Sequence, residues 1–341
     1  DAKADLNRDH LLQSQPESQA FYRVARRVLP HLAADCHEFT RDGEDYVRIG
    51  EDHVRRAWER WPIITLDACN HPLIPASLKI EGLRVVETAA PVLAKAGHPY
   101  ARYTVGGPAP EEEIRPSTPE VDDGRNGLGS HGAVSFIIEA GVRRSAKDPQ
   151  ADLGIRVDAY LTLFQHLLGT PESRARIFEL SEKARREPLP PFIATNTFWG
   201  NVDGKVGLVK MSDPASGQVL EIPTANLMLD LVIKSSVPTP KAYVIEAGAA
   251  KIFRPLLEHH GLVFRELAAA ERLKAERCRL VRWEAPYDEL YQRYENRTIV
   301  ARDAAVEREF PAGTLVVALD QPLARRAIQV LEPCLLYGLY S

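Results

Sequence analysis

Apolar side chains recur at a helical spacing near the start of the chain. Residues 16–29 carry pairs of apolar residues four positions apart, so the pairs fall on one stripe of a helix: Ala20/Phe21, Val24/Ala25 and Val28/Leu29. Pro16 suits the first turn, and the helix dipole favours the carboxylate of Glu17 there. The pattern therefore predicts a helix that begins at Pro16 and ends before Pro30.

Two apolar runs of strand length are each followed by one ionisable residue. Residues 32–36 form a short run before His37, and residues 133–138 form a continuous run, rich in β-branched residues, before Glu139. Continuous runs are typical of parallel strands that are covered on both faces. Since the functional crevice of an open α/β sheet lies outside the carboxyl ends of its strands, we expect His37 and Glu139 to converge there.

Each of these residues also has an ordinary structural interpretation. A single histidine after a strand is more often a hydrogen-bonded loop residue than a metal ligand. A carboxylate after five apolar residues must be solvated, paired or functional, because burying it unpaired is costly. Asn7 and Arg8 alone indicate only a polar loop before a helix. Cys36 is expected to be buried in the packing of the first strand.

Further elements are predicted around these two strands. Residues 62–66 fit a strand or an apolar loop, and residues 75–96 fit a helix. Residues 106–123 are rich in Pro and Glu, which favours an exposed loop near the cleft. Two more helices are expected over about residues 151–168 and 172–186.

The pattern changes after residues 187–191, Glu-Pro-Leu-Pro-Pro, which we interpret as a linker. Turn residues beyond it predict, in order, hairpins over residues 200–220, a strand–helix–strand unit over residues 242–264, and a β-rich remainder with a late helix from about residue 321. We therefore predict two domains, residues 1–187 and residues 188–341. His259 and His260 resemble a metal pair, but adjacent helical residues face different directions, which favours interaction with the helix dipole.

The composition is that of an ordinary soluble enzyme. The 341 residues fit about two domains, and 45% hydrophobic residues can form a sizeable core. The formal net charge of −4 gives no reason to expect nucleic acid, and the lack of an 18-residue apolar run predicts no membrane span. Four cysteines without Cys-x-x-Cys spacing neither prove nor exclude an oxidising compartment. We expect a secreted or periplasmic protein; the oligomeric state is not indicated.

The order of the motifs is more specific than any one of them. Asp-Leu-Asn-Arg-Asp at residues 5–9 is followed by the Pro-Glu helix, by Asp-Cys-His-Glu at residues 35–38, and, after a long stretch, by Ser-Phe-Ile-Ile-Glu at residues 135–139. This order resembles the carboxypeptidase A-like zinc metallopeptidases. The resemblance is closest to bacterial members with Asn-Arg-Asp-His-Leu, here residues 7–11, and Pro-Glu-x-Gln-Ala, here residues 16–20. It covers roughly the first predicted domain.

The resemblance implies a fold and a set of roles. The fold would be a three-layer α/β/α domain with a mixed sheet, incomplete at its amino end, followed by a mixed α/β appendage. Asn7 and Arg8 would bind the terminal carboxylate of the substrate, which the planar fork of arginine can hold with two hydrogen bonds. His37 would be a ligand of Zn²⁺, and Glu139 the base that accepts the proton of the zinc-bound water. Asp35 either orients His37 or makes a structural loop contact.

The sequence also departs from the family pattern. No His-x-x-Glu zinc motif occurs in the 341 residues, so only one of three zinc ligands has a candidate. We expect that an upstream segment with the motif is omitted; the alternative is a processed or degenerate product. Residues 122–131 lack the proton-donating tyrosine of the family. Arg125 and His131 are the reactive-looking residues there, with a solvated turn as the simpler interpretation, and Arg125 is retained as a candidate for substrate binding.

The sequence therefore predicts a zinc-dependent metallocarboxypeptidase-type hydrolase. Its substrate would be a peptide, or a peptidoglycan-derived molecule, with a free carboxylate. The alternative is an inactive peptide-binding pseudoenzyme, or a processed fragment, that cannot bind zinc. The sequence does not indicate a task for residues 188–341.

Overall fold

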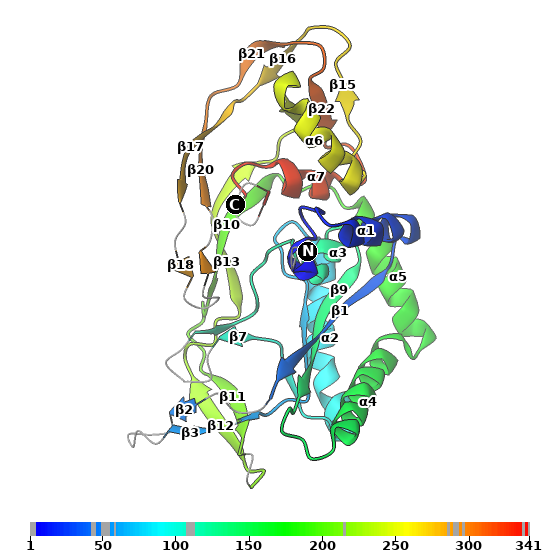
Figure 1. Ribbon diagram of the computed structural model, residues 1–341, viewed down its shortest axis with the longest axis vertical. Helices are drawn as coiled ribbons and strands as arrows, with labels where there is room; N and C mark the ends of the chain where they lie inside the picture. The colour runs from blue at the N-terminus through cyan, green and yellow to red at the C-terminus, as the bar shows by residue number, and fades with distance from the viewer. Residues whose placement is uncertain are drawn as a thin grey trace.

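The chain is built around a four-stranded mixed sheet with the strand order β1-β9-β5-β6. Figure 1 shows two of its strands, β1 and β9, side by side. Strand β1 is parallel to β9, β9 is antiparallel to β5, and β5 is parallel to β6. The four strands are Leu32–Thr40 (β1), Val134–Val142 (β9), Ile64–Ala68 (β5) and Tyr100–Arg102 (β6). The chain therefore contains a mixed α/β fold, as the sequence predicts.

The computed structural model describes residues 5–41, 46–48, 55–57, 59–106, 113–213, 216–284, 287–288, 293–294, 297–335 and 338–339. No described helix combines the length and the apolar character that a bilayer crossing requires.

Three helices cover one face of the sheet: α2 (Ala76–Lys95), α4 (Pro149–Leu168) and α5 (Pro171–Arg186). Their apolar side chains form one cluster with the sheet residues Leu66, Phe136 and Ile138, all of which are fully buried. Successive side chains of a strand point to opposite faces. The residues next to Leu66, Phe136 and Ile138 along their strands therefore point to the other face of the sheet. That second face carries the predicted site.

The second face is covered by α1 (Pro16–Val28) and α3 (Gly124–Gly129). Tyr22 of α1 packs against Ala33 of β1 and Leu128 of α3. Helices on both faces explain why the β9 run is continuously apolar, since neither side of this central strand meets water freely.

Most elements of the first predicted domain agree with the sequence. The helix predicted from Pro16 is α1, and the helices predicted over residues 75–96, 151–168 and 172–186 are α2, α4 and α5. Strand β5 begins at Ile64, within the run at residues 62–66. Cys36 is exposed rather than buried, because its side chain projects from β1, a strand at the edge of the sheet.

Two sequence predictions in this domain are wrong in detail. The strands β1 and β9 do not end before His37 and Glu139, because their parallel pairing continues to Thr40 and Val142. The loop over residues 106–123 was predicted to be exposed, but it is largely buried from residue 114 onward. Residues 107–112 of this loop lie outside the described part of the chain. Ile114 exchanges backbone hydrogen bonds with Asn226 and Met228, at 3.0 and 2.8 Å, so the C-terminal part covers it.

The described residues of the C-terminal part form two helices, several antiparallel strand pairs and the three-stranded sheet β14-β22-β15. This part also reaches back to the first part, since β11 pairs with both β12 and β4 (Glu59–Arg60). Its elements are β10 (Phe192–Gly200), β11 (Gly207–Ser212), β12 (Val219–Thr224), β13 (Asp230–Pro238), β14 (Ala242–Ile245), α6 (Ala247–His260), β15 (Arg265–Glu266), β16 (Glu271–Ala275), β17 (Cys278–Glu284), β18 (Tyr287–Asp288), β19 (Arg293–Tyr294), β20 (Arg297–Arg302), β21 (Val306–Phe310), β22 (Leu315–Ala318) and α7 (Ala324–Leu331). The first part further contains the short 3-10 helix Leu6–Arg8 (η1) and the short strands β2 (Tyr46–Arg48), β3 (Arg55–Ala57), β7 (Val105–Gly106) and β8 (Ile114–Arg115).

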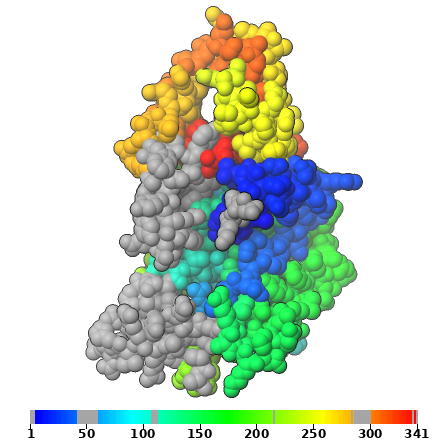
Figure 2. Space-filling view, viewed as in Figure 1, coloured from blue at the N-terminus to red at the C-terminus, as the bar shows by residue number. Residues whose placement is uncertain are grey.

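The two parts share a hydrophobic cluster. Leu11, Leu73 and Val121 from before the predicted linker pack with residues of α6, β22 and α7. Figure 2 shows the blue N-terminal segment in contact with the yellow and red C-terminal helices. The linker is also fastened, because Arg325 of α7 donates to the carbonyl oxygens of Glu187 and Pro188 at 2.9 and 2.8 Å. The boundary between residues 187 and 188 stays a prediction.

His260 belongs to this contact rather than to a metal pair. It is fully buried, its Nε2 donates to the Leu11 carbonyl oxygen at 2.7 Å, and its Nδ1 accepts from Gln13 at 3.0 Å and Arg326 at 3.1 Å. Burial holds the pKa of His260 well below its ordinary value. A neutral imidazole cannot act as the cation that the sequence placed against the helix dipole.

Candidate functional site

The register of the sheet brings the predicted residues together. His37 of β1 and Glu139 of β9 are paired across the parallel strands, and Thr65 of β5 is paired with Glu139 on its other side. Asp35 precedes His37 by two residues and so lies on the same face. The site therefore lies on the face of the sheet, and the predicted convergence of His37 and Glu139 is confirmed although both residues are inside their strands.

A hydrogen-bonded group forms around the imidazole of His37. Its Nε2 lies 2.8 Å from Asp35 Oδ1 and 3.2 Å from Asn7 Nδ2. The amide of Gly124, at the start of α3, donates to Asp35 Oδ2 at 3.1 Å and to Asn7 Oδ1 at 3.3 Å. Asp35 therefore makes both of the contacts that the sequence left open, one with His37 and one with the backbone at the start of α3.

Gly124 is required by this close approach. A Cβ atom at this position would lie 2.8 Å from Asp35 Oδ2, closer than a methyl group can come to a carboxylate oxygen without a shift. Glycine thus allows the backbone of α3 to approach the Asp35–His37 pair, one of the uses of a residue without a side chain.

Asp35 and His37 each stabilise the charged form of the other, so the pKa values of both groups are shifted. The hydrogen bond that the His37 imidazole donates to Asp35 raises the pKa of His37 above its ordinary value, against the effect of burial. Burial works to raise the pKa of Asp35, but the hydrogen bond and charge of His37 outweigh it, so that pKa is lowered. A carboxylate that fixes a histidine in this way orients the ring and raises its basicity.

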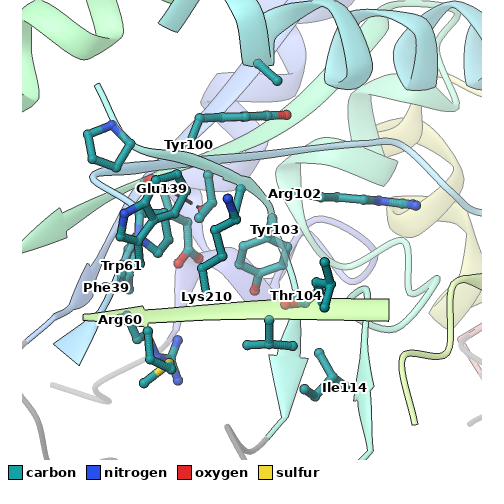
Figure 3. A pocket seen from close by; sticks show the side chains of 18 of the residues that line it. Phe39, Arg60, Trp61, Tyr100, Arg102, Tyr103, Thr104, Ile114, Glu139 and Lys210 are labelled. Atoms are coloured by element: carbon teal, nitrogen blue, oxygen red, sulfur yellow. Dashed lines mark hydrogen bonds between the residues drawn. The ribbon is translucent and has the colours of Figure 1, made fainter. Parts of the chain in front are cut away.

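Glu139 lies at the edge of a cavity of about 690 Å³. Figure 3 shows its side chain among Trp61, Tyr103 and Lys210. Burial raises the pKa of Glu139, although the charges of His37 and Arg60 oppose this shift. The carboxyl group is therefore a better proton acceptor than an ordinary exposed glutamate.

Tyr160 fixes the strands where His37 and Glu139 face each other. From α4, its hydroxyl lies 2.8 Å from the carbonyl oxygen of His37 and 3.1 Å from that of Ile138. Tyr160 lies on the apolar stripe of the helix predicted over residues 151–168, and that pattern indicates no role for its hydroxyl. A hydroxyl on such a stripe must find a partner when it is buried, and that requirement was the available signal.

Arg8 and Asn7 lie next to each other in the short helix η1. Asp5 caps this helix by accepting from the Asn7 amide at 3.0 Å, and Arg8 Nη1 donates to the Asn7 carbonyl oxygen at 2.9 Å. Arg8 stays exposed. Partial desolvation lowers the pKa of Arg8, but nearby carboxylates, first that of Asp122, outweigh it and raise the pKa.

Arg125 occupies a different environment from Arg8. Its side chain is fully buried, and its Nη2 donates to Ser117 Oγ at 2.6 Å and to Asp123 Oδ2 at 3.1 Å. Asp67 Oδ2 lies 3.6 Å from Nη1. His131 is also buried, with a pKa of about 3 because of desolvation. The substrate-binding role of Arg125 stays a prediction.

Sequence reasoning missed most of the cavity wall. Trp61 comes just before β5, and Lys210 comes from β11 beyond the predicted linker. Lys210 Nζ lies 5.0 Å from the centre of the Trp61 ring, a cation–π distance. No local pattern indicates that these two residues meet, because their contact depends on the pairing of β11 with β4.

The described residues offer only part of the ligand set that a zinc ion needs. Within the described ranges, no three His, Cys, Asp or Glu side chains are placed to hold one metal ion. Catalytic zinc sites use three protein ligands and one open position. His37 is a suitable donor with an oriented ring, but the described residues do not by themselves complete a zinc site.

Comparisons with models of protein families, with curated proteins and with solved structures found no match to this chain.

Proposed function

We propose that the chain carries part of the active site of a zinc metallocarboxypeptidase-type hydrolase with a three-layer carboxypeptidase-like domain. The substrate is a peptide, or a peptidoglycan-derived molecule, with a free carboxylate. The observation that supports the proposal best is the convergence of Asn7, Asp35, His37 and Glu139, which belong to three separate segments, on one face of the sheet.

Asn7 and Arg8 would hold the substrate by its carboxylate. Arg8 is exposed next to the Asn7–His37 contact, and arginine presents two parallel donors to a carboxylate. The end of the substrate would then lie beside the imidazole of His37.

Glu139 would then move the proton of the reaction. A general base works best when its pKa lies towards the working pH, and burial shifts the pKa of Glu139 in that direction. Glu139 would take a proton from the attacking water and give it to the leaving amine.

Zinc, with His37 as one ligand, would supply Lewis-acid polarisation of the scissile carbonyl. The proposal requires two more ligands, which the described residues do not provide.

The test compares peptides with a free and an amidated C-terminus on the complete gene product. Replacing Arg8 by Ala removes a charge-assisted contact worth about 1.5–3 kcal/mol. We expect kcat/KM for the free-acid peptide to fall by about 10- to 100-fold, whereas the amidated peptide changes little. Arg27→Ala, an exposed arginine of α1, is the matched control. An equal loss for both peptides would contradict the role of Arg8.

A second candidate function is a peptide-binding protein without metal. The partial donor set around His37 favours it. Such a protein would bind the free-acid peptide through Arg8 but would show neither hydrolysis nor bound zinc.

A further inference from the structure

Two of the four cysteines lie in the C-terminal part, outside the proposed catalytic site. Cys278 is the first residue of β17, and Cys334 follows the end of α7. Both side chains are half-buried, so a small molecule can reach them. The two residues are far apart in the sequence, and any contact between them therefore depends on the fold.

The register of β17 and β20 places Cys278 beside Arg302. These two residues are directly opposite each other in the antiparallel pair. Side chains of such a pair leave the strands on the same face, with Cβ atoms about 4.5–5.5 Å apart. The amide of Asp303 donates to the Arg277 carbonyl oxygen at 2.9 Å, so the pairing is still held at this end of the ladder.

A buried carboxylate brings Cys334 to the same arginine. Arg302 Nη2 forms an ion pair with Glu332, whose side chain is fully buried. The amide of Cys334 donates to Glu332 Oε1 at 3.1 Å, and the thiol of Cys334 itself hydrogen-bonds with Arg302. The hydroxyl of Tyr243 donates to Glu332 Oε2 at 3.1 Å, which holds the other carboxylate oxygen. The thiols of Cys278 and Cys334 thus both adjoin the side chain of Arg302.

The ionisation of the two thiols is also coupled. Burial is the main cause that raises the pKa of Cys278 and of Cys334, and the guanidinium of Arg302 opposes the rise in both. The negative charge of Cys334 adds to the rise of the pKa of Cys278, so the two sulfur atoms lie within electrostatic reach of each other. Because only the thiolate attacks a disulfide, both residues react faster in mildly alkaline solution.

The other two cysteines are not placed to form a pair. Cys36 lies on β1 and Cys69 directly follows β5, and β9 lies between these two strands. Two strand spacings amount to about 9.5 Å. A disulfide requires Cα atoms within about 7 Å of each other.

We propose that Cys278 and Cys334 form a dithiol that a small-molecule disulfide oxidises to an intramolecular disulfide, which fastens the chain after α7 to β17. One cysteine thiolate attacks the small disulfide and releases one small thiol. The second thiolate attacks the cysteine sulfur of the mixed disulfide and releases the other small thiol. The two protein thiols are oxidised, and the small disulfide is reduced to two thiols that take up the two protons.

The bond would act on the helix that holds the N-terminal segment. Arg326 of α7 donates to the His10 carbonyl oxygen, and the bond lies just beyond the end of that helix. The secreted or periplasmic location that the sequence predicts would supply an oxidising compartment. The proposal does not depend on the hydrolase function.

The experiment follows each cysteine of the full chain by peptide mass spectrometry. The parent protein carries Cys36→Ser, which removes the exposed thiol of the first part and leaves the other three. The reduced parent is incubated with oxidised glutathione at about pH 8.5, the ordinary pKa of cysteine, and the remaining thiols are alkylated. The controls are Cys278→Ser in the same background and the same reaction of the parent in urea.

In the folded parent, we expect most chains to carry a bond between Cys278 and Cys334, whereas the fully buried Cys69 stays free. The ratio of linked to glutathione-bound Cys334 should be at least about tenfold higher in the folded chain than in urea, because the fold raises the effective concentration of one thiol at the other. In the Cys278→Ser variant, Cys334 should have no cysteine partner in the protein. The proposal is overturned if Cys278 and Cys334 stay free or each carry glutathione in the folded parent, or if the ratio is the same in urea.

Discussion

Glu139 is both part of a buried strand and part of a cavity wall. It continues an apolar strand, and its carboxyl group opens onto a cavity. Its raised pKa follows from burial, with His37 opposing the shift. Glu139 faces His37 across the strand pair and borders the cavity, and the charges of His37 and Arg60 are close enough to oppose the rise of its pKa.

Replacing Glu139 by Gln tests its role as a base. The change keeps the shape and removes the proton acceptor, so kcat of the complete gene product should fall by at least about 100-fold. Metal content and peptide affinity should persist, as measured by elemental analysis and calorimetry. Glu38→Gln, an exposed carboxylate on the neighbouring edge strand β1, is the control. Near-normal turnover by Glu139→Gln would leave Glu139 a structural residue.

The candidate site could be predicted in part because its residues follow apolar runs. Those runs identified β1 and β9, and hence His37 and Glu139. The exact positions were missed because strand ends depend on pairing, which continues to Thr40 and Val142. The burial of Arg125 could not be foreseen either, since its partners Asp67 and Ser117 are brought to it only by the folded sheet and the segment that precedes α3.

At the scale of elements, α6 and α7 bind the N-terminal segment that carries Asn7 and Arg8, through hydrogen bonds to the carbonyl oxygens of Leu11 and His10. Arg326 of α7 is fully buried, and it donates to His260 Nδ1 at 3.1 Å, to Gln329 Oε1 at 3.2 Å and to the His10 carbonyl oxygen. Its guanidinium also lies 5.5 Å from the centre of the Tyr22 ring. These contacts join residues from opposite ends of the chain, and no local periodicity could have predicted them.

Replacing Arg326 by Met should therefore affect both stability and the site. The change removes the donor to the His10 carbonyl oxygen and to Gln329 Oε1, at about 1–3 kcal/mol for each buried group, so we expect the free energy of unfolding to fall by about 2–4 kcal/mol. Arg326→Lys should not rescue it, because one ammonium cannot reproduce three separated contacts. Urea unfolding measures the change, with Arg272→Met, an exposed arginine of β16, as the control. A loss no larger than that of the control would show that the contact does not hold the N-terminal segment.

At the scale of the whole molecule, three neutral histidines are buried. Desolvation lowers the pKa of His71 and of His131 to about 3, and that of His260 well below its ordinary value. His71 and His131 lie in the first part of the chain, whereas His260 lies in the contact between the two parts.

The stability of the protein should therefore fall as the solution is acidified below pH 6.5 or so, the ordinary pKa of histidine. Between that pH and the lowered pKa values, the unfolded chain binds more protons than the folded chain, so acidification favours unfolding. Each histidine contributes about 1.4 kcal/mol at one pH unit below its unfolded pKa, or about 4 kcal/mol for the three together. His37 and Glu139, whose pKa values are raised, work in the opposite direction but are two groups against the three buried histidines. Urea unfolding at pH 7.5 and pH 5.5 measures the difference, and equal stability at the two pH values would contradict the buried neutral state.

The direct test of the proposed function is the zinc content of the complete gene product, compared with that of its His37→Ala variant. The account predicts about one zinc ion per wild-type chain, the stoichiometry of a single catalytic site. The variant should lose most of the metal while its circular dichroism spectrum stays unchanged, because His37 is half-buried and its removal opens no core cavity. A wild-type protein without zinc, or a His37→Ala variant that keeps zinc with wild-type affinity, would contradict the assignment of His37 and with it the metallocarboxypeptidase proposal.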